Sequence, residues 1–178
     1  MAEITVGQKP ATLNASDTAY TGIEGRFRAT GEGTLTEVTL TVGANTDDTK
    51  VGTFSTSKYV AFTLRDYATI GTVLAGASRT FTGLSIDVYT NDYIGQYSSA
   101  TGLRYNSSSP NNAYRYNGDG FSAGTFNCTN HTRNFALYAE GETVVSEKII
   151  AGSVLTETGW QRIITADKLK LRTSDGWQ

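Results

Sequence analysis

The residues that could support catalysis are few. Cys128 and His131 lie three residues apart in NCTNHT, so a thiolate and an imidazole could meet there. His131 is the only histidine, and we find no third group to orient it. The sequence has no G-x-S-x-G, H-E-x-x-H or phosphate-binding glycine motif. We therefore expect a small buried thiol and a loop imidazole, and no enzyme.

Carboxylates offer a second kind of chemistry. Those near predicted turns are Asp47 with Asp48, Asp87 with Asp92, and Asp119. A glycosidase needs two carboxyl groups about 5–10 Å apart across a groove. No spacing here sets such a pair, so we expect turn formers, and a glycoside-acting enzyme is the least favoured interpretation.

Calcium binding is a further alternative. Four residues on predicted loops offer the hard oxygen ligands that Ca²⁺ accepts in irregular sets. These candidates are Asp47, Asp48, Asn117 and Asp119. Their spacing differs from that of an EF-hand loop, so we expect no cofactor, with a structural calcium as the exception.

Tyrosine is the residue type that most suggests binding. Six of the ten tyrosines fall between residues 89 and 116. The set is Tyr89, Tyr93, Tyr97, Tyr105, Tyr114 and Tyr116. Tyr93 and Tyr97 have the strand parity opposite to Ile94, so we expect them to face outward. Outward-facing tyrosines give a rigid surface of apolar rings and hydroxyl groups, which suits a glycan or a protein partner. The bland alternative is that individual rings only cover the edge of the fold.

The elements that would position these residues are strands. Val38, Leu40 and Val42 alternate with polar residues, as in a half-buried strand, and 133–142 repeats this pattern. Asn91-Asp92 predicts a turn between two strands, and Asn117-Gly118 predicts a hairpin with a type I′ turn. The region 98–133 has weak periodicity, so we expect extended loops with one short hairpin. Short strands at turn spacing predict an all-β protein, an antiparallel jelly-roll-like β-sandwich over 1–141.

Beyond this sandwich, residues 142–178 resemble a β arm. Such a segment cannot hide its apolar face alone, so it must cover its own sandwich or contact another copy. Trp160 and Trp177 have the large aromatic side chains that dominate subunit interfaces. The expected interface set is Val144, Val145, Ile149, Ile150, Trp160, Ile163, Ile164, Leu169, Leu171 and Trp177. We predict a homo-oligomer, most simply a trimer or a lattice.

Composition excludes several partners. The 178 residues are 18% charged with a net charge of −2, so there is no basic patch for nucleic acid. No apolar run is long enough for a membrane span, and the N-terminus lacks the pattern of a signal peptide. One cysteine excludes an intramolecular disulfide. We expect synthesis in a cytosol.

The stretch GLSIDVYTNDYIGQY resembles the strand, turn and strand pattern of jelly-roll modules. These occur in bacteriophage virion surface proteins, namely decoration, fibre and tail proteins, and in carbohydrate-binding domains. The resemblance implies a non-enzymatic structural or adhesive virion protein that contacts other virion proteins and acts on the virion or outside the cell after release. The alternative that it implies is a carbohydrate-binding module whose Tyr-rich face holds a cell-surface glycan.

Overall fold

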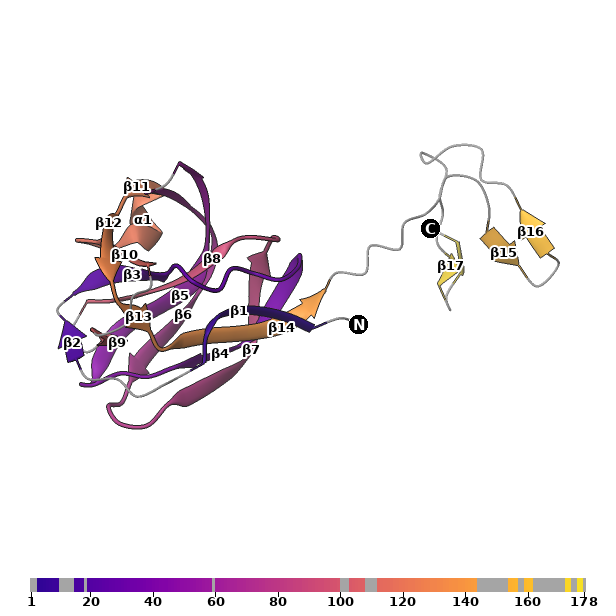
Figure 1. Cartoon of the computed structure of the whole chain (residues 1–178). Coiled ribbons are helices and arrows are strands. Elements are labelled where there is room, and N and C mark those ends of the chain that lie inside the picture. Colours follow the sequence, from indigo (N-terminus) through magenta and orange to yellow (C-terminus); the bar gives the residue numbers. More distant parts are fainter. Residues whose placement is uncertain are drawn as a thin grey trace. The chain divides into compact units, whose positions relative to one another are not determined.

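The fold is that of a computed structural model of the whole chain (Figure 1). The chain divides into two compact units, residues 1–144 and 145–178, close to the predicted boundary between 141 and 142. The structure describes residues 3–9, 15–17, 19–58, 60–99, 103–107, 112–143, 154–156, 159–161, 172–173 and 176–177.

One sheet of the first unit has four antiparallel strands in the order β1-β14-β4-β7. Val38 and Leu40 of β4, and Leu137 and Ala139 of β14, are buried, as their alternation predicted. The strands are β1 (Glu3–Gln8), β4 (Gly33–Leu40), β7 (Arg79–Val88) and β14 (Leu137–Thr143).

A second sheet has seven antiparallel strands in the order β11-β6-β5-β8-β3-β10-β12. Its members β3, β5, β6 and β8 combine with the four-stranded sheet to give the eight-strand order of a jelly roll. The predicted all-β antiparallel jelly-roll sandwich is therefore confirmed. These four strands are β3 (Tyr20–Glu24), β5 (Thr46–Lys58), β6 (Ala61–Val73) and β8 (Tyr93–Ser98).

The segment between β8 and β14 is built of short strands. The prediction of extended loops over 98–133 is wrong, because strands of three to five residues are too short to show alternation. Two of its strands, β9 and β13, form a small sheet, β13-β9-β2, with β2 (Ala15–Asp17), which precedes β3. The elements of the segment are β9 (Leu103–Asn106), β10 (Asn112–Tyr116), α1 (Gly120–Ala123), β11 (Thr125–Asn127), β12 (Thr129–Thr132) and β13 (Asn134–Phe135).

This segment nearly closes the seven-stranded sheet. β11 pairs with β6 at one end of the sheet, and β12 pairs with β10 at the other end. Only Cys128 separates β11 from β12, and its backbone N–H donates to the Val60 carbonyl at 2.9 Å. The two outermost strands are thus joined by one residue, and the sheet curls around an interior.

Two apolar cores result. The first lies between the two sheets and includes Leu35, Val51, Ile86 and Phe135. The second fills the curled sheet and is mainly aromatic, with rings of Phe62 and Tyr114 at 4.8 Å between centroids. One buried side chain comes from each of β3, β5, β6, β8, β10 and β11, and α1 and the linking residue add one each. The buried residues of this core are Ile23, Phe54, Phe62, Tyr93, Tyr114, Phe121, Phe126 and Cys128.

Of two predicted turns, the structure contains one and not the other. Asn91 has φ of 71°, and Asp92 N–H donates to the Tyr89 carbonyl at 2.9 Å, which confirms the turn at 91–92. The hairpin predicted at Asn117-Gly118 is wrong. There, β10 leads into α1, and Asn117 lacks the positive φ that a type I′ turn requires.

The second unit, described by itself, contains two pairs of short antiparallel strands among its described residues. β15 (Val154–Thr156) pairs with β16 (Gly159–Gln161), and β17 (Arg172–Thr173) pairs with β18 (Gly176–Trp177). Within the described part of the whole chain, no helix has the length and apolar character needed to cross a membrane.

Candidate functional site

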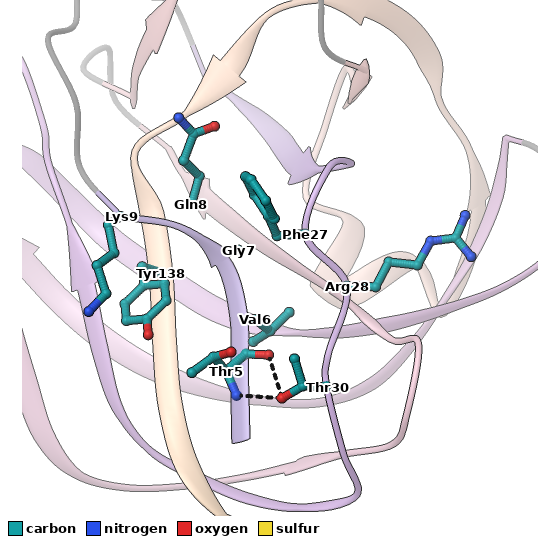
Figure 2. A pocket seen from close by; sticks show the side chains of 9 residues that line it. All are labelled: Thr5, Val6, Gly7, Gln8, Lys9, Phe27, Arg28, Thr30 and Tyr138. Atoms are coloured by element: carbon teal, nitrogen blue, oxygen red, sulfur yellow. Dashed lines mark hydrogen bonds between the residues drawn. The ribbon is translucent and has the colours of Figure 1, made fainter. Parts of the chain in front are cut away.

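A cleft of about 460 Å³ lies beside β1, where the chain from β3 to β4 passes the edge of the four-stranded sheet (Figure 2). This volume is within the range of about 300–1,000 Å³ that is typical of small-molecule sites. The lining residues come from β1 and the residue that follows it, from this connection and from β14. They are Thr5, Val6, Gly7, Gln8, Lys9, Phe27, Arg28, Thr30 and Tyr138.

Backbone hydrogen bonds hold the two walls together. Gly7 N–H donates to the Phe27 carbonyl at 2.8 Å, and Thr30 N–H donates to the Thr5 carbonyl at 3.1 Å. Thr5 N–H donates to Thr30 Oγ1 at 3.0 Å. The connection therefore pairs with the outer edge of β1, and it presents Phe27 beside the strand.

Glycine is required at the centre of this wall. Gly7 has φ of +82°, and a Cβ atom there would lie 2.2 Å from the Leu137 carbonyl oxygen. Any other residue would be strained and would push β1 away from β14. In the register of β1 and β14, Gly7 lies opposite Tyr138.

Two aromatic rings border the cleft. Phe27 is 43% exposed, which is unusual for so apolar a ring, and the Arg26 guanidinium lies 4.7 Å from its centroid. Across Gly7, Tyr138 is half-buried, with Lys9 Nζ 4.8 Å from its ring (Figure 2). Burial and a hydrogen bond with Glu140 raise the pKa of Tyr138, so its hydroxyl stays protonated at neutral pH.

The charged lining residues are both cations. Lys9 Nζ lies 3.5 Å from Glu140, but its side chain is 73% exposed, so this ion pair is weak. Arg28 points away from Lys9 and Tyr138 (Figure 2), and its guanidinium lies 4.7 Å from the Tyr93 ring. Gln8 adds an amide whose Oε1 is buried without a hydrogen-bond partner.

The six tyrosines do not form one outward face. Tyr89 is 45% exposed, and Tyr97 and Tyr116 are half-buried. The expected exposure is wrong for the other three, since Tyr93, Tyr105 and Tyr114 are buried. The predicted parity of Tyr93, opposite to Ile94, is correct. Its ring is nevertheless buried, because the side that would face solvent in a flat sheet is the interior of the curled one.

The candidate calcium ligands accept hydrogen bonds from protein donors instead. Asp119 Oδ2 receives Lys50 Nζ at 2.7 Å, Asp47 Oδ1 receives the Thr72 hydroxyl at 3.1 Å, and Asn117 Oδ1 receives Arg115 Nε at 2.9 Å. Asp48 lies 3.6 Å from the same Lys50 ammonium. In the described part of the chain, no group of three His, Cys, Asp or Glu residues could hold a metal ion.

Lys50 therefore provides the positive charge between Asp48 and Asp119. Burial raises the pKa of Asp119, but hydrogen bonds from Lys50, Ser122 and the Phe121 N–H outweigh it and hold that pKa below its usual value. Asp119 also caps α1 through the Phe121 N–H, at 2.9 Å from Oδ1. The role that these contacts give Asp119 is structural.

The groups weighed for catalysis are buried or held by neighbouring groups. Burial raises the pKa of Cys128 to about 12, so its thiolate is scarce at neutral pH. His131 lies on β12, with Nε2 3.0 Å from the Thr129 hydroxyl. Asp92 binds Arg65 through both carboxylate oxygens and accepts the Tyr89 N–H at 2.9 Å.

Most of the predicted interface residues lie outside the described residues: Val144, Val145, Ile149, Ile150, Ile163, Ile164, Leu169 and Leu171. Trp160 lies on β16, opposite Leu155, and Trp177 lies on β18, opposite Arg172.

The cleft residues Gln8, Lys9, Phe27 and Tyr138 were missed by the sequence analysis. The one available signal was an aromatic residue between two arginines, Arg26-Phe27-Arg28, a composition that suits an exposed ring rather than a core strand. Comparison with known proteins adds no assignment, since no family model, curated protein or solved structure matches this chain.

Proposed function

We propose that this protein is a non-enzymatic structural component of a virion-like assembly, which displays its jelly roll and forms homo-oligomers through residues 145–178. The observation that carries the proposal is the separate second unit. It is shorter than the roughly 40 residues that usually fold alone, and its described strands form only two-stranded pairs. Such pairs need another surface to cover their apolar side chains.

The jelly-roll unit supports a display role. Its two cores consist of residues within 1–144, so this unit buries its apolar side chains without residues 145–178. A self-contained body with a short appended unit suits subunits that join through their ends. The assignment to a virion rests on the resemblance to phage surface modules.

Solution mass tests this proposal. We expect the full chain to form a defined oligomer, and the variant Trp160→Ser with Trp177→Ser to dissociate, since large buried aromatic side chains contribute about 2 kcal/mol or more each to an interface. Sedimentation equilibrium measures both species. Tyr67→Ser, which changes an exposed ring of the first unit, serves as the matched control and keeps the oligomer. A monomeric full chain would contradict the proposal.

Carbohydrate binding is the second candidate function. The Tyr-rich face gives it less support than expected, because three of its rings are buried. The cleft of Figure 2 favours it instead, since an exposed aromatic ring and flexible polar side chains meet there. Titration of the full chain with a panel of soluble glycans tests this function, and no binding to any of them would contradict it.

A further inference from the structure

We propose that the cleft between Phe27 and Tyr138 is a binding site for an acidic saccharide, with Lys9 as the partner of the sugar carboxylate. The inference rests on the second candidate function, carbohydrate binding, and places it at a surface distinct from the predicted tyrosine set. Three features of the cleft carry it: its rings, its charge and the unpaired amide oxygen of Gln8.

The rings supply an apolar surface for a sugar. One face of a pyranose ring presents C–H groups, which pack on an aromatic face while the hydroxyl groups point outward. Phe27 is 43% exposed, and its connection is held against β1 by hydrogen bonds from the Gly7 N–H to the Phe27 carbonyl and from the Thr30 N–H to the Thr5 carbonyl. A backbone fixed before binding loses little conformational entropy when a ligand packs on the ring that it carries.

The charge selects an anionic ligand. Among the nine lining residues, Lys9 and Arg28 are cations and there is no carboxylate. Lys9 Nζ contacts Glu140 and the Tyr138 ring, but its side chain is 73% exposed, so both contacts are weak and it can turn toward a ligand at small cost. Figure 2 shows Lys9 and Tyr138 together on one side of Gly7, whereas Arg28 points away. A carboxylate on a sugar packed in the cleft would therefore meet Lys9.

Hydrogen bonding distinguishes a saccharide from a purely apolar anion. Gln8 Oε1 is buried without a hydrogen-bond partner, and an unpaired buried acceptor is unfavourable. A rotation of this amide toward the cleft would let a sugar hydroxyl, which both donates and accepts, satisfy it. Tyr138 keeps its phenolic proton, because burial and Glu140 raise its pKa.

The test uses a matched ligand pair, methyl galacturonoside and methyl galactoside, which differ by a carboxylate in place of a hydroxymethyl group. Each is titrated into the isotope-labelled full chain at low salt, and amide chemical shifts report affinity and location. We expect the galacturonoside to bind about threefold more tightly. Phe27→Ala should weaken it about fivefold, and Lys9→Gln should remove the preference between the two ligands.

Two variants act as controls. Arg28→Gln removes a cation of the same cleft that points away from Lys9, and it should leave the preference in place. Tyr89→Ala removes an exposed ring of the tyrosine set. If Tyr89→Ala lost binding and Phe27→Ala did not, the proposal that the cleft is the binding site would be overturned. The proposal of carbohydrate binding would remain.

The remaining outcomes separate the two proposals. If sodium acetate changed the amide chemical shifts as much as the galacturonoside does, the cleft would be a general anion site. The proposal of a saccharide ligand would then be overturned. Equal binding of the two glycosides would overturn the role of Lys9. Absence of binding to either glycoside would overturn the acidic-saccharide site, whereas only failure of the wider glycan panel would overturn carbohydrate binding itself.

Discussion

At the scale of single residues, Glu24 is the most unusual side chain. It is fully buried on β3, and its carboxylate accepts the backbone N–H groups of Arg26 and Phe135, both at 3.0 Å. Its pKa is raised to about 7, because burial outweighs the lowering by these hydrogen bonds and by the charge of Arg26. The carboxylate joins the end of β3 to β13, and burial makes its ionisation unfavourable.

Stability should therefore fall as pH rises. Glu24 binds a proton in the folded state up to about pH 7 but releases it near pH 4.5 when unfolded, so the free energy of unfolding should decrease between these values by at most about 3 kcal/mol. Glu24→Gln should flatten this decrease. Chemical denaturation at pH 5, 6, 7 and 8 measures it. Glu37→Gln on β4 is the control, and an unchanged profile in Glu24→Gln would contradict the prediction.

At the scale of elements, α1 depends on one carboxylate. Asp119 caps the helix and also binds Lys50 on β5, so it fastens the only helix of the described residues to the curled sheet. Asp119→Ala should lower the free energy of unfolding by about 1–2 kcal/mol. Asp119→Asn keeps a capping oxygen and should lose less. Thermal unfolding followed by circular dichroism compares the two, and equal losses would show that the cap contributes little.

The prediction from sequence succeeded where strands are long. Alternation over 36–43 and 133–142 correctly gave buried faces, and the turn at Asn91 was found from its residue types. It failed for β10 to β12, where each strand is too short to show a period. The cleft could not be predicted, because no local sequence pattern reveals the backbone hydrogen bond between Gly7 and Phe27, which are far apart in the sequence.

At the scale of the whole molecule, the boundary of the first unit matters. β14 continues past the predicted end at residue 141, since Glu142 pairs with Thr34 and Thr143 pairs with Gly33. A chain ending at residue 144 should therefore unfold at nearly the same temperature as the first unit of the full chain, whereas a chain ending at residue 141 should unfold several degrees lower. Calorimetry on both truncated chains tests this. Equal midpoints would show that these last pairs are dispensable.

The single-residue link at Cys128 limits how this protein can be altered. Inserting even a short peptide between β11 and β12 would separate the two outer strands and expose backbone groups that could capture strands from other molecules. Epitopes or labels placed there would promote aggregation. The exposed turn at residues 75–77, between β6 and β7, offers a safer place for such a graft.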